Sequence, residues 1–288
     1  MDGVVVLLKP PGMTSSNAVY DTRKLLSVRR AGHLGTLDPA AAGVLPICLG
    51  RATRLFDLLV DKDKEYIFEL AFGARTDTQD AYGRVLARDV RLISREALAA
   101  ALPDFLGEQR QTASVYSALK VGGRKMCDLA RAGENVEPRE REVRVTALEL
   151  LEQTGERRFL LRVVCSRGTY VRALCESIAE RLGTIAYVSF LLRTRAGPFT
   201  IEHALSAGEL REALGRGTIA ERIVSCEEAI AFLPALRLPN ERRTASVNAL
   251  ETRVGGATEG AVRLYAGEEF LGVGRVENGA VKLAIHLY

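Results

Sequence analysis

The stretch GHLGTLDPAAAGVLP, residues 32–46, places one carboxylate, that of Asp38, in a loop rich in glycine and alanine. Asp followed by Pro is a frequent turn opener, because the Asp side chain accepts from nearby backbone N–H groups and Pro fixes φ. On this pair alone, Asp38 is an ordinary turn residue. A carboxylate on a loop framed by glycine and proline is also held rigidly enough for chemistry, so the rest of the chain has to decide between the two interpretations.

The composition is that of an ordinary globular protein. The chain has 288 residues, of which 47% are hydrophobic and 26% are charged, and this length suits one large domain with a smaller one. No apolar run approaches the about 20 residues of a membrane-spanning helix. The start, MDGVVVLLKPPG, has no basic region before its short apolar run, so it predicts a strand rather than a signal peptide. We therefore expect a cytoplasmic protein without a membrane partner.

The five cysteines and three histidines show no ligand spacing and no CxxC pair. This pattern predicts reduced, structural thiols and no metal site.

The positive charge is carried mainly by arginine, although the formal net charge is only +4. There are 33 arginines and seven lysines. Arginine grips phosphate with two parallel hydrogen bonds and stacks on bases, whereas a genomic or thermal bias toward arginine would give the same total. The clusters are more informative than the total, and they occupy residues 29–33, 122–125 and 139–144.

Strand and helix patterns alternate over the first 230 residues. Apolar runs predict the following strands: 4–8, 44–49, 66–72, 186–192, and a hairpin of 143–151 with 159–165. Capping residues and glycine stops predict the following helices: 15–26, 95–106 closed by Gly107, and one after Thr169 with Gly183 as its stop. These elements predict an α+β domain, residues 1–230, with flanking helices around a mostly antiparallel central sheet.

A second pattern begins near Pro234 and Pro239. Short strands separated by glycine-containing turns are predicted at 261–264, 269–276 and 280–287. We therefore expect a small β-rich domain over residues 231–288, which suits binding better than chemistry.

Five further motifs accompany the Asp38 loop: KPPGMTS (9–15), KEY (64–66), FGARTDTQDAYG (72–83), YSALK (116–120) and CSRGTYVR (165–172). In this order and spacing the set resembles the bacterial tRNA pseudouridine-55 synthases, the TruB family. The resemblance covers nearly the whole chain, and the frame Gly-His-x-Gly-x-Leu-Asp-Pro is its most specific part. It implies a pseudouridine-synthase fold, a PUA-like C-terminal RNA-binding domain and an RNA-clamping insertion at about 109–140.

The resemblance also assigns site residues. It implies three catalytic residues: Asp38, the active-site tyrosine Tyr66, and Arg172, which pairs with the aspartate. It implies four substrate-binding residues: His33, which fills the gap left by the extracted base, Lys9, Tyr170 and Leu191. The basic clusters add three contacts to the RNA backbone: Arg124, Lys125 and Arg139.

The chemistry implied by the resemblance fits these residue types. Extruding a uridine from a folded RNA loop costs a few kcal/mol, and stacking on an aromatic side chain returns about 1–3 kcal/mol per base. Breaking and remaking a glycosidic bond needs no metal, redox cofactor or ATP, so we expect no cofactor. The expected partner is the T-arm stem-loop of tRNA, bound by a monomer without an obligatory protein partner.

Taken singly, each of these residues has an ordinary structural explanation, as a turn residue, a strand aromatic, a solvated charge or a core side chain. Taken jointly, they favour an enzyme. The alternative is a tRNA-binding folding chaperone on the same scaffold, although binding alone needs no unscreened carboxylate facing an anionic partner. Guide-RNA-dependent relatives are a third possibility, and the short C-terminal domain makes it weaker.

The chain departs from the family pattern at a few positions. Leu34 stands where a small polar Thr is usual, and Ala40–Ala42 replace Leu-Ala-Thr. In the insertion, Ala113 and Cys127 replace a usual Pro and Tyr. We expect these changes to affect how the loop and the insertion meet RNA rather than the reaction itself.

Overall fold

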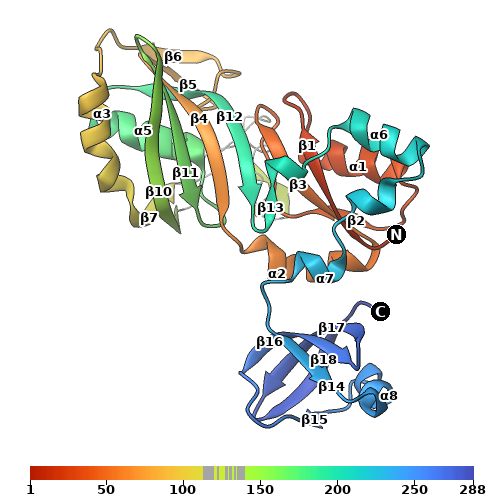
Figure 1. Cartoon of the computed structure of the whole chain (residues 1–288). Helices are drawn as coiled ribbons and strands as arrows, with labels where there is room; N and C mark the ends of the chain where they lie inside the picture. The colour runs from red at the N-terminus through yellow and green to blue at the C-terminus, as the bar shows by residue number, and fades with distance from the viewer. Residues whose placement is uncertain (113–119, 122, 127–128, 130–131, 133, 135–139) are drawn as a thin grey trace.

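A long β-sheet organises most of the chain in the computed structural model, which describes residues 1–112, 120–121, 123–126, 129, 132, 134 and 140–288. Its strands run in the order β1–β3–β12–β4–β11–β10–β7, with β2 beside β3 and β13 beside β12 (Figure 1). Among the described residues every neighbouring pair is antiparallel except β12 with β3, so the predicted, mostly antiparallel sheet is confirmed. The strand bounds are Gly3–Lys9 (β1), Ala31–His33 (β2), Ala42–Leu49 (β3), Lys64–Phe72 (β4), Gly107–Thr112 (β7), Glu140–Gly155 (β10), Arg158–Cys165 (β11), Ala186–Ala196 (β12) and Phe199–Thr200 (β13).

One face of this sheet is buried beneath helices, because its strands alternate apolar and polar side chains with a period of two. Phe68 and Leu70 of β4 and Phe159 and Leu161 of β11 are fully buried in one core. Helices α3 and α5 cover this face, as Figure 1 shows. The helix bounds are Ser15–Leu25 (α1), Phe56–Val60 (α2), Arg95–Ala101 (α3), Val171–Arg181 (α5), Ala207–Gly215 (α6), Cys226–Ala229 (α7) and Arg243–Val247 (α8).

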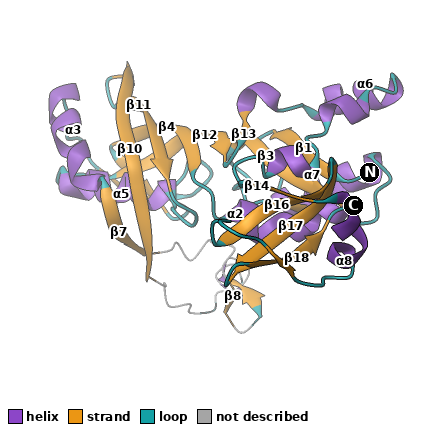
Figure 2. Cartoon of the chain, turned by 60° about the horizontal axis from the view of Figure 1, so that its bottom comes forward, coloured by secondary structure: helices purple, strands orange, loops and turns teal. Residues whose placement is uncertain are grey.

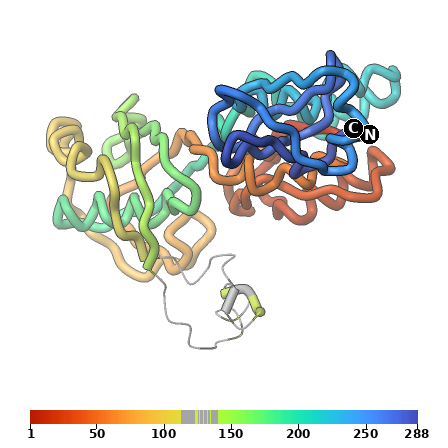
Figure 3. The backbone as a smooth tube through the Cα atoms, turned by 90° about the horizontal axis from the view of Figure 1, so that it is seen from below, coloured from red at the N-terminus to blue at the C-terminus, as the bar shows by residue number. Residues whose placement is uncertain are grey.

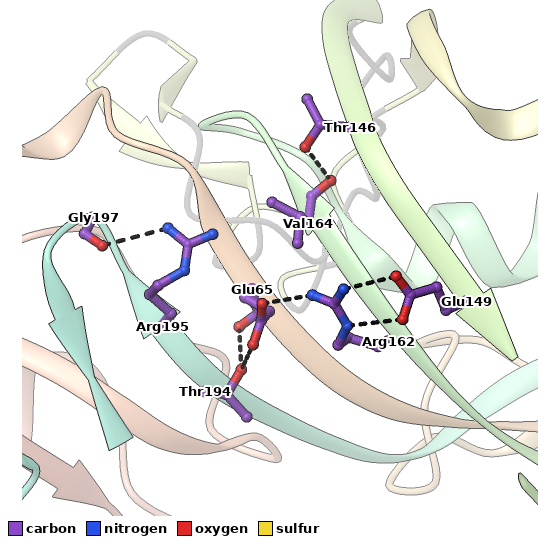
Figure 4. A network of polar contacts seen from close by, with 8 residues as sticks. All are labelled: Glu65, Thr146, Glu149, Arg162, Val164, Thr194, Arg195 and Gly197. Atoms are coloured by element: carbon purple, nitrogen blue, oxygen red, sulfur yellow. Dashed lines mark hydrogen bonds and ion pairs between the residues drawn. The ribbon is translucent and has the colours of Figure 1, made fainter. Parts of the chain in front are cut away.

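Over β4, β10, β11 and β12 the opposite face of the sheet is polar, and side-chain contacts connect these four strands. Arg162 of β11 donates to Glu65 of β4 at 2.7 Å and to both carboxylate oxygens of Glu149 of β10 at 3.1 and 2.7 Å (Figure 4). Thr194 of β12 donates to Glu65 at 2.8 Å. The hydrogen bonds from Arg162 hold the pKa of Glu149 below its usual value. Because these groups are partly exposed, the network serves strand register more than net stability.

Three predicted elements have ends that differ from the structure. The helix predicted over 95–106 is α-helical only to Ala101 and continues as a 3-10 helix, Leu102–Phe105. Pro103 explains the change, because it has no N–H to donate and its ring clashes with the carbonyl one turn earlier. Strand β10 of the hairpin and strand β12 also run beyond their predicted ends, to Gly155 and Ala196.

A second sheet follows near the C-terminus, in the order β14–β16–β17–β18–β15. Figures 2 and 3 show it beside the N-terminal strands and away from β10 and β11. Val273 of this region belongs to the same hydrophobic cluster as Val4 of β1 and Val44 of β3, so one cluster joins the two sheets. Its strand bounds are Ala235–Leu238 (β14), Thr252–Arg253 (β15), Gly260–Ala266 (β16), Glu269–Glu277 (β17) and Ala280–His286 (β18).

Four short strands complete the described part of the chain. They form two-stranded sheets, β5 (Ala74–Thr76) with β6 (Val85–Arg88) and β8 (Lys120–Val121) with β9 (Arg124–Lys125).

Within the described residues, no helix combines the length and the apolar character needed to cross a bilayer.

The parallel contact between β3 and β12 is unusually close. Gly43 of β3 lies opposite Arg193 of β12 with a φ of +115°. A Cβ atom on Gly43 would lie 2.2 Å from the carbonyl oxygen of Arg193 and 2.7 Å from its backbone nitrogen. Only glycine fits here, because both the backbone conformation and the space exclude a side chain.

We predict that Gly43→Ala lowers the free energy of unfolding by about 2–4 kcal/mol, through backbone strain and displacement of β12. Denaturant unfolding monitored by circular dichroism measures it. Gly215→Ala is the matched control, since Gly215 ends α6 and a Cβ there would meet no atom of the described residues within 4 Å. An equal loss in both variants would contradict this explanation.

Candidate active site

The Asp38 loop is fixed from three directions. The hydroxyl of Ser15, the first residue of α1, donates to the carbonyl of Leu37 at 2.8 Å and accepts from its N–H at 2.9 Å. The N–H of Gly12 donates to the carbonyl of Pro39 at 2.7 Å. The N–H of Ala41 donates to the carbonyl of Asp38 at 3.1 Å. Asp38 therefore opens a turn, as its sequence context predicts, and the KPPGMTS motif holds that turn in place.

The carboxylate of Asp38 forms an ion pair with Arg172, the second residue of α5. The Arg172 Nε lies 2.8 Å from Oδ2 of Asp38. The orientation of this N–H does not meet the geometry of a hydrogen bond, so the contact is electrostatic rather than directional. The side chain of Arg172 is 5% exposed and that of Asp38 is 31% exposed. The cation is thus buried behind a carboxylate that faces solvent.

The TDTQD motif orients this arginine. Nη1 of Arg172 donates to the carbonyl of Thr78 at 2.9 Å. The loop that carries Thr78 is held by the Thr78 hydroxyl, which donates to Asp80 at 2.6 Å, and by the carbonyl of Gln79, which accepts from Val188 of β12 at 3.0 Å. Gln79 itself has a φ of +65°, in the left-handed region. The motif therefore acts as a support for Arg172.

A cavity of about 320 Å³ opens in front of the ion pair. This volume falls within the range of small-molecule sites. The walls include six of the seven residues predicted for catalysis and substrate binding: His33, Asp38, Tyr66, Tyr170, Arg172 and Leu191. Burial raises the pKa of the Tyr66 phenol above its usual value, and the neighbouring Arg193 opposes this shift.

Lys9 occupies a different place from the one predicted. Its side chain is fully buried, outside the cavity lining, and its ammonium donates to the carbonyls of Pro10 and Met13 at 2.7 and 2.8 Å and approaches that of Pro39 at 3.5 Å. Burial lowers the pKa of Lys9 to about 8, against the attraction of Asp38. Lys9 supports the loop from below, so it is a positioning residue rather than a direct contact for substrate.

Two buried cations were missed in the sequence. Arg193 is 1% exposed, and its guanidinium donates to Val44 at 2.7 Å and to the carbonyls of Gly35 and Thr36 at 3.2 Å. Lys64 lines the same cavity and donates to the carbonyls of Val60 and Lys62. Burial, followed by repulsion from Arg193, lowers the pKa of Lys64 to about 8. A charged residue inside an apolar strand was the available signal for Arg193.

Arg141 joins the cavity from the 139–144 cluster. Its guanidinium carbon lies 5.4 Å from the centre of the Tyr170 ring, and its Nη1 donates to Gly168 at 3.3 Å. The backbone N–H of Tyr170 donates to the side-chain oxygen of the buried Gln111 at 2.9 Å. Tyr170 is therefore held at the cavity wall through both its ring and its backbone.

The predicted contacts to the RNA backbone fall in the insertion. Arg124 forms an exposed ion pair with Glu134 at 2.8 Å. Lys125 belongs to β9, its side chain is outside the described residues, and Arg139 lies wholly outside them, as do Ala113 and Cys127. No group of three or more His, Cys, Asp or Glu side chains in the described residues is arranged to hold a metal ion.

The fold and this site define a class of protein. A solved structure of an H/ACA RNP bound to a substrate RNA containing 2′-deoxyuridine matches with a TM-score of 0.77 and 25% identity, over 99% of this chain and 85% of that chain. The fold is that of the pseudouridine synthases, as the sequence motifs implied.

Sequence comparison narrows the class to a family. Residues 23–171 match the model of the TruB family pseudouridylate synthase N-terminal domain. The tRNA pseudouridine synthase B of Pelotomaculum thermopropionicum is 44% identical over 81% of this chain and 76% of its own length. That of an Azoarcus species is 40% identical over 98% of this chain and 93% of its own. The chain belongs to the TruB family.

We predict a pH-dependent stability contribution from Lys9. Its folded pKa of about 8 lies below the ordinary 10.5, so between these values the unfolded chain binds more protons and stability rises with pH. The penalty for burying the charged form is complete below about pH 8 and is relieved as the pH approaches 10.5. The unfolding free energy of the wild type minus that of Lys9→Met should therefore rise by on the order of 1–3 kcal/mol from pH 7.5 to 10.

Chemical denaturation across this pH range measures the difference. The exposed Lys282 of β18 supplies the control, because Lys282→Met should leave a flat difference. A flat difference for Lys9→Met as well would show that Lys9 titrates normally and is not buried as a cation.

Proposed function

We propose that this chain isomerises uridine to pseudouridine at position 55 in the T loop of tRNA. The observation that carries the proposal is the Asp38–Arg172 ion pair, at 2.8 Å, on the wall of a cavity that also contains Tyr66, His33 and Leu191. The family membership and the relatives described above support the reaction and the RNA substrate.

Each residue has a role that its position supports. Arg172 balances the charge of Asp38, while about a third of the aspartate side chain stays exposed at the cavity. A uridine must leave its stack to enter, and Tyr66 and Tyr170 supply aromatic surfaces for it. His33, at the end of β2, occupies the gap that the base leaves in the RNA.

The reaction detaches uracil from the ribose, turns it and rejoins it through C5. Asp38 starts this sequence either as a nucleophile at C1′ or as a base that removes a proton at C2′; a single carboxylate serves both routes. A bond from C5 to the ribose replaces the one from N1, and the proton lost from C5 is balanced by one gained at N1. The chemistry therefore balances without a co-reactant or cofactor.

Recognition of the substrate extends beyond the cavity. We assign residues 1–230 to catalysis, with the insertion at about 109–140 clamping RNA, and residues 231–288 to a PUA-like RNA-binding domain. The proposal places the enzyme in the cytoplasm as a monomer. The buried, free thiols of Cys48, Cys165, Cys175 and Cys226 fit a reducing compartment.

A folding chaperone that only binds tRNA is the second candidate on this scaffold. A pure binder would gain nothing from the partly exposed carboxylate of Asp38, because the other charged residues of the cavity lining are cations: Lys64, Arg141, Arg167, Arg172 and Arg193. A carboxylate facing a polyanion lowers affinity, so its presence fits chemistry better than binding alone.

We predict that Asp38→Asn removes product formation and keeps RNA binding. On an unmodified T-arm stem-loop without added cofactor, the single-turnover rate should fall by about 10³-fold or more, while the dissociation constant changes little. Asp104→Asn, at an exposed carboxylate paired with Arg181, is the control and should keep the wild-type rate. Product from wild type and Asp38→Asn alike would remove Asp38 from the chemistry.

We predict that Arg124→Ala weakens tRNA binding without slowing the chemical step at saturating enzyme. Losing one phosphate contact should reduce the slope of log affinity against log salt by about one. Arg139→Ala should behave in the same way. Arg216→Ala, at an exposed arginine paired with Glu212 at the end of α6, is the matched control. A variant with normal affinity and a slower chemical step would contradict the assignment.

A further inference from the structure

A second, shallow crevice adjoins the reaction cavity and shares three of its walls, Asp38, Arg172 and Leu191. Its enclosed volume is only about 20 Å³, room for roughly one water molecule. The rest of its lining includes Ala40 and Ala41 of the Asp38 loop and two aromatic residues, Tyr82 and Phe190. Nothing in the proposed reaction uses these two aromatic residues.

Both aromatic side chains are exposed although they border a buried ion pair. Tyr82 is 71% exposed and Phe190 is 46% exposed. Isolated exposed apolar residues are common and need no explanation. These two, however, are not isolated, because they line one crevice together with Asp38 and Arg172.

The backbone brings these two residues to the same crevice. Asp80 forms a parallel bridge with Val188, and the N–H of Ala81 donates to the carbonyl of Val188 at 3.0 Å. Tyr82 lies in the turn after this bridge, Phe190 follows an irregularity in β12 after Val188, and both residues line the crevice. The N–H of Tyr82 also donates to the carboxylate of Asp80 at 3.0 Å, which fixes the loop that carries the ring.

We propose that Tyr82 and Phe190 form a second base-binding subsite, which stacks the base of a nucleotide adjacent to the target uridine. This inference rests on the proposed function, because it places the target uridine at Asp38. A flanking nucleotide cannot lie far from a uridine held there, since the two share a phosphodiester.

The chemistry of the rim favours a base over a phosphate. Exposed aromatic rings are the surfaces on which RNA-binding proteins stack unpaired bases. The charged residues of the crevice lining are Asp38, Asp80 and Arg172, and Arg172 is already paired with Asp38. The excess carboxylate disfavours a phosphate group but not the face of a neutral base. The small volume means that the base lies across the rim rather than entering the crevice.

The test combines protein variants with RNA variants. Dissociation constants are measured for wild type, Tyr82→Ala, Phe190→Ala and Tyr82→Phe on a T-arm stem-loop. They are measured again on two matched RNAs that lack the base immediately 5′ or 3′ of the target uridine. Leu86→Ala is the control, because Leu86 is a 53% exposed apolar residue of strand β6 in the same hairpin.

On intact RNA, each alanine variant should bind roughly five- to a hundred-fold more weakly, in line with the loss of one stacked base. Tyr82→Phe and Leu86→Ala should bind like wild type. On one of the two abasic RNAs, the loss caused by the alanine variants should disappear, because the base that they stack is already missing.

Two results would overturn the subsite. Equal weakening on intact and both abasic RNAs would mean that the rings act through the protein fold, and no weakening on intact RNA would mean that they touch no base. Pseudouridine formation by the wild type is assayed in parallel. If the wild type forms no pseudouridine while the effect of the alanine variants still depends on the flanking base, the proposed reaction fails and the subsite stands.

Discussion

The buried guanidinium of Arg193 is the contact on which the site depends. It reaches from β12 to the carbonyl of Val44 in β3 and to those of Gly35 and Thr36 in the Asp38 loop. The same residue lies in register with Gly43, which has no space for a side chain. Strand β12 also pairs with β4, which carries Tyr66. The contact between β3 and β12 at Gly43 and Arg193 therefore sets the distance from Tyr66 to the carboxylate of Asp38.

The site contains three buried cations that are satisfied mainly by backbone carbonyls, namely Lys9, Lys64 and Arg193. Burying a charge is costly unless hydrogen bonds compensate it, and burial lowers the pKa of both lysines to about 8. Carbonyl partners leave the net positive charge in place, whereas carboxylate partners would cancel it. The result is a positive field directed at the place where an anionic RNA and a carboxylate must meet.

The sequence predicted most of this fold, because periodicity, capping residues and glycine stops are local signals. It also predicted which side chains gather at the cavity, since the motifs that carry them are specific. Lys9 was misassigned because a lysine that ends a strand looks the same whether its ammonium is exposed or buried. Arg193 was missed because its partners are backbone carbonyls some 150 residues away, and backbone groups leave no mark on composition. Pro103 was a local signal, and the predicted helix over 95–106 overlooked it.

The departures from the family pattern in the Asp38 loop lie at its two ends, and each has a structural explanation. Leu34 is 2% exposed and packs in a hydrophobic cluster with Val44 and Leu55, so its larger apolar side chain fills core rather than facing RNA. Ala40, at the other end, lines the crevice beside the ion pair, where a small side chain keeps the space open. Between them, the bonds of Ser15 to Leu37 are independent of both changes. The loop can therefore vary at its ends while Asp38 keeps its place, because Ser15 of α1 holds the loop backbone and Arg172 of α5 supplies the balancing charge.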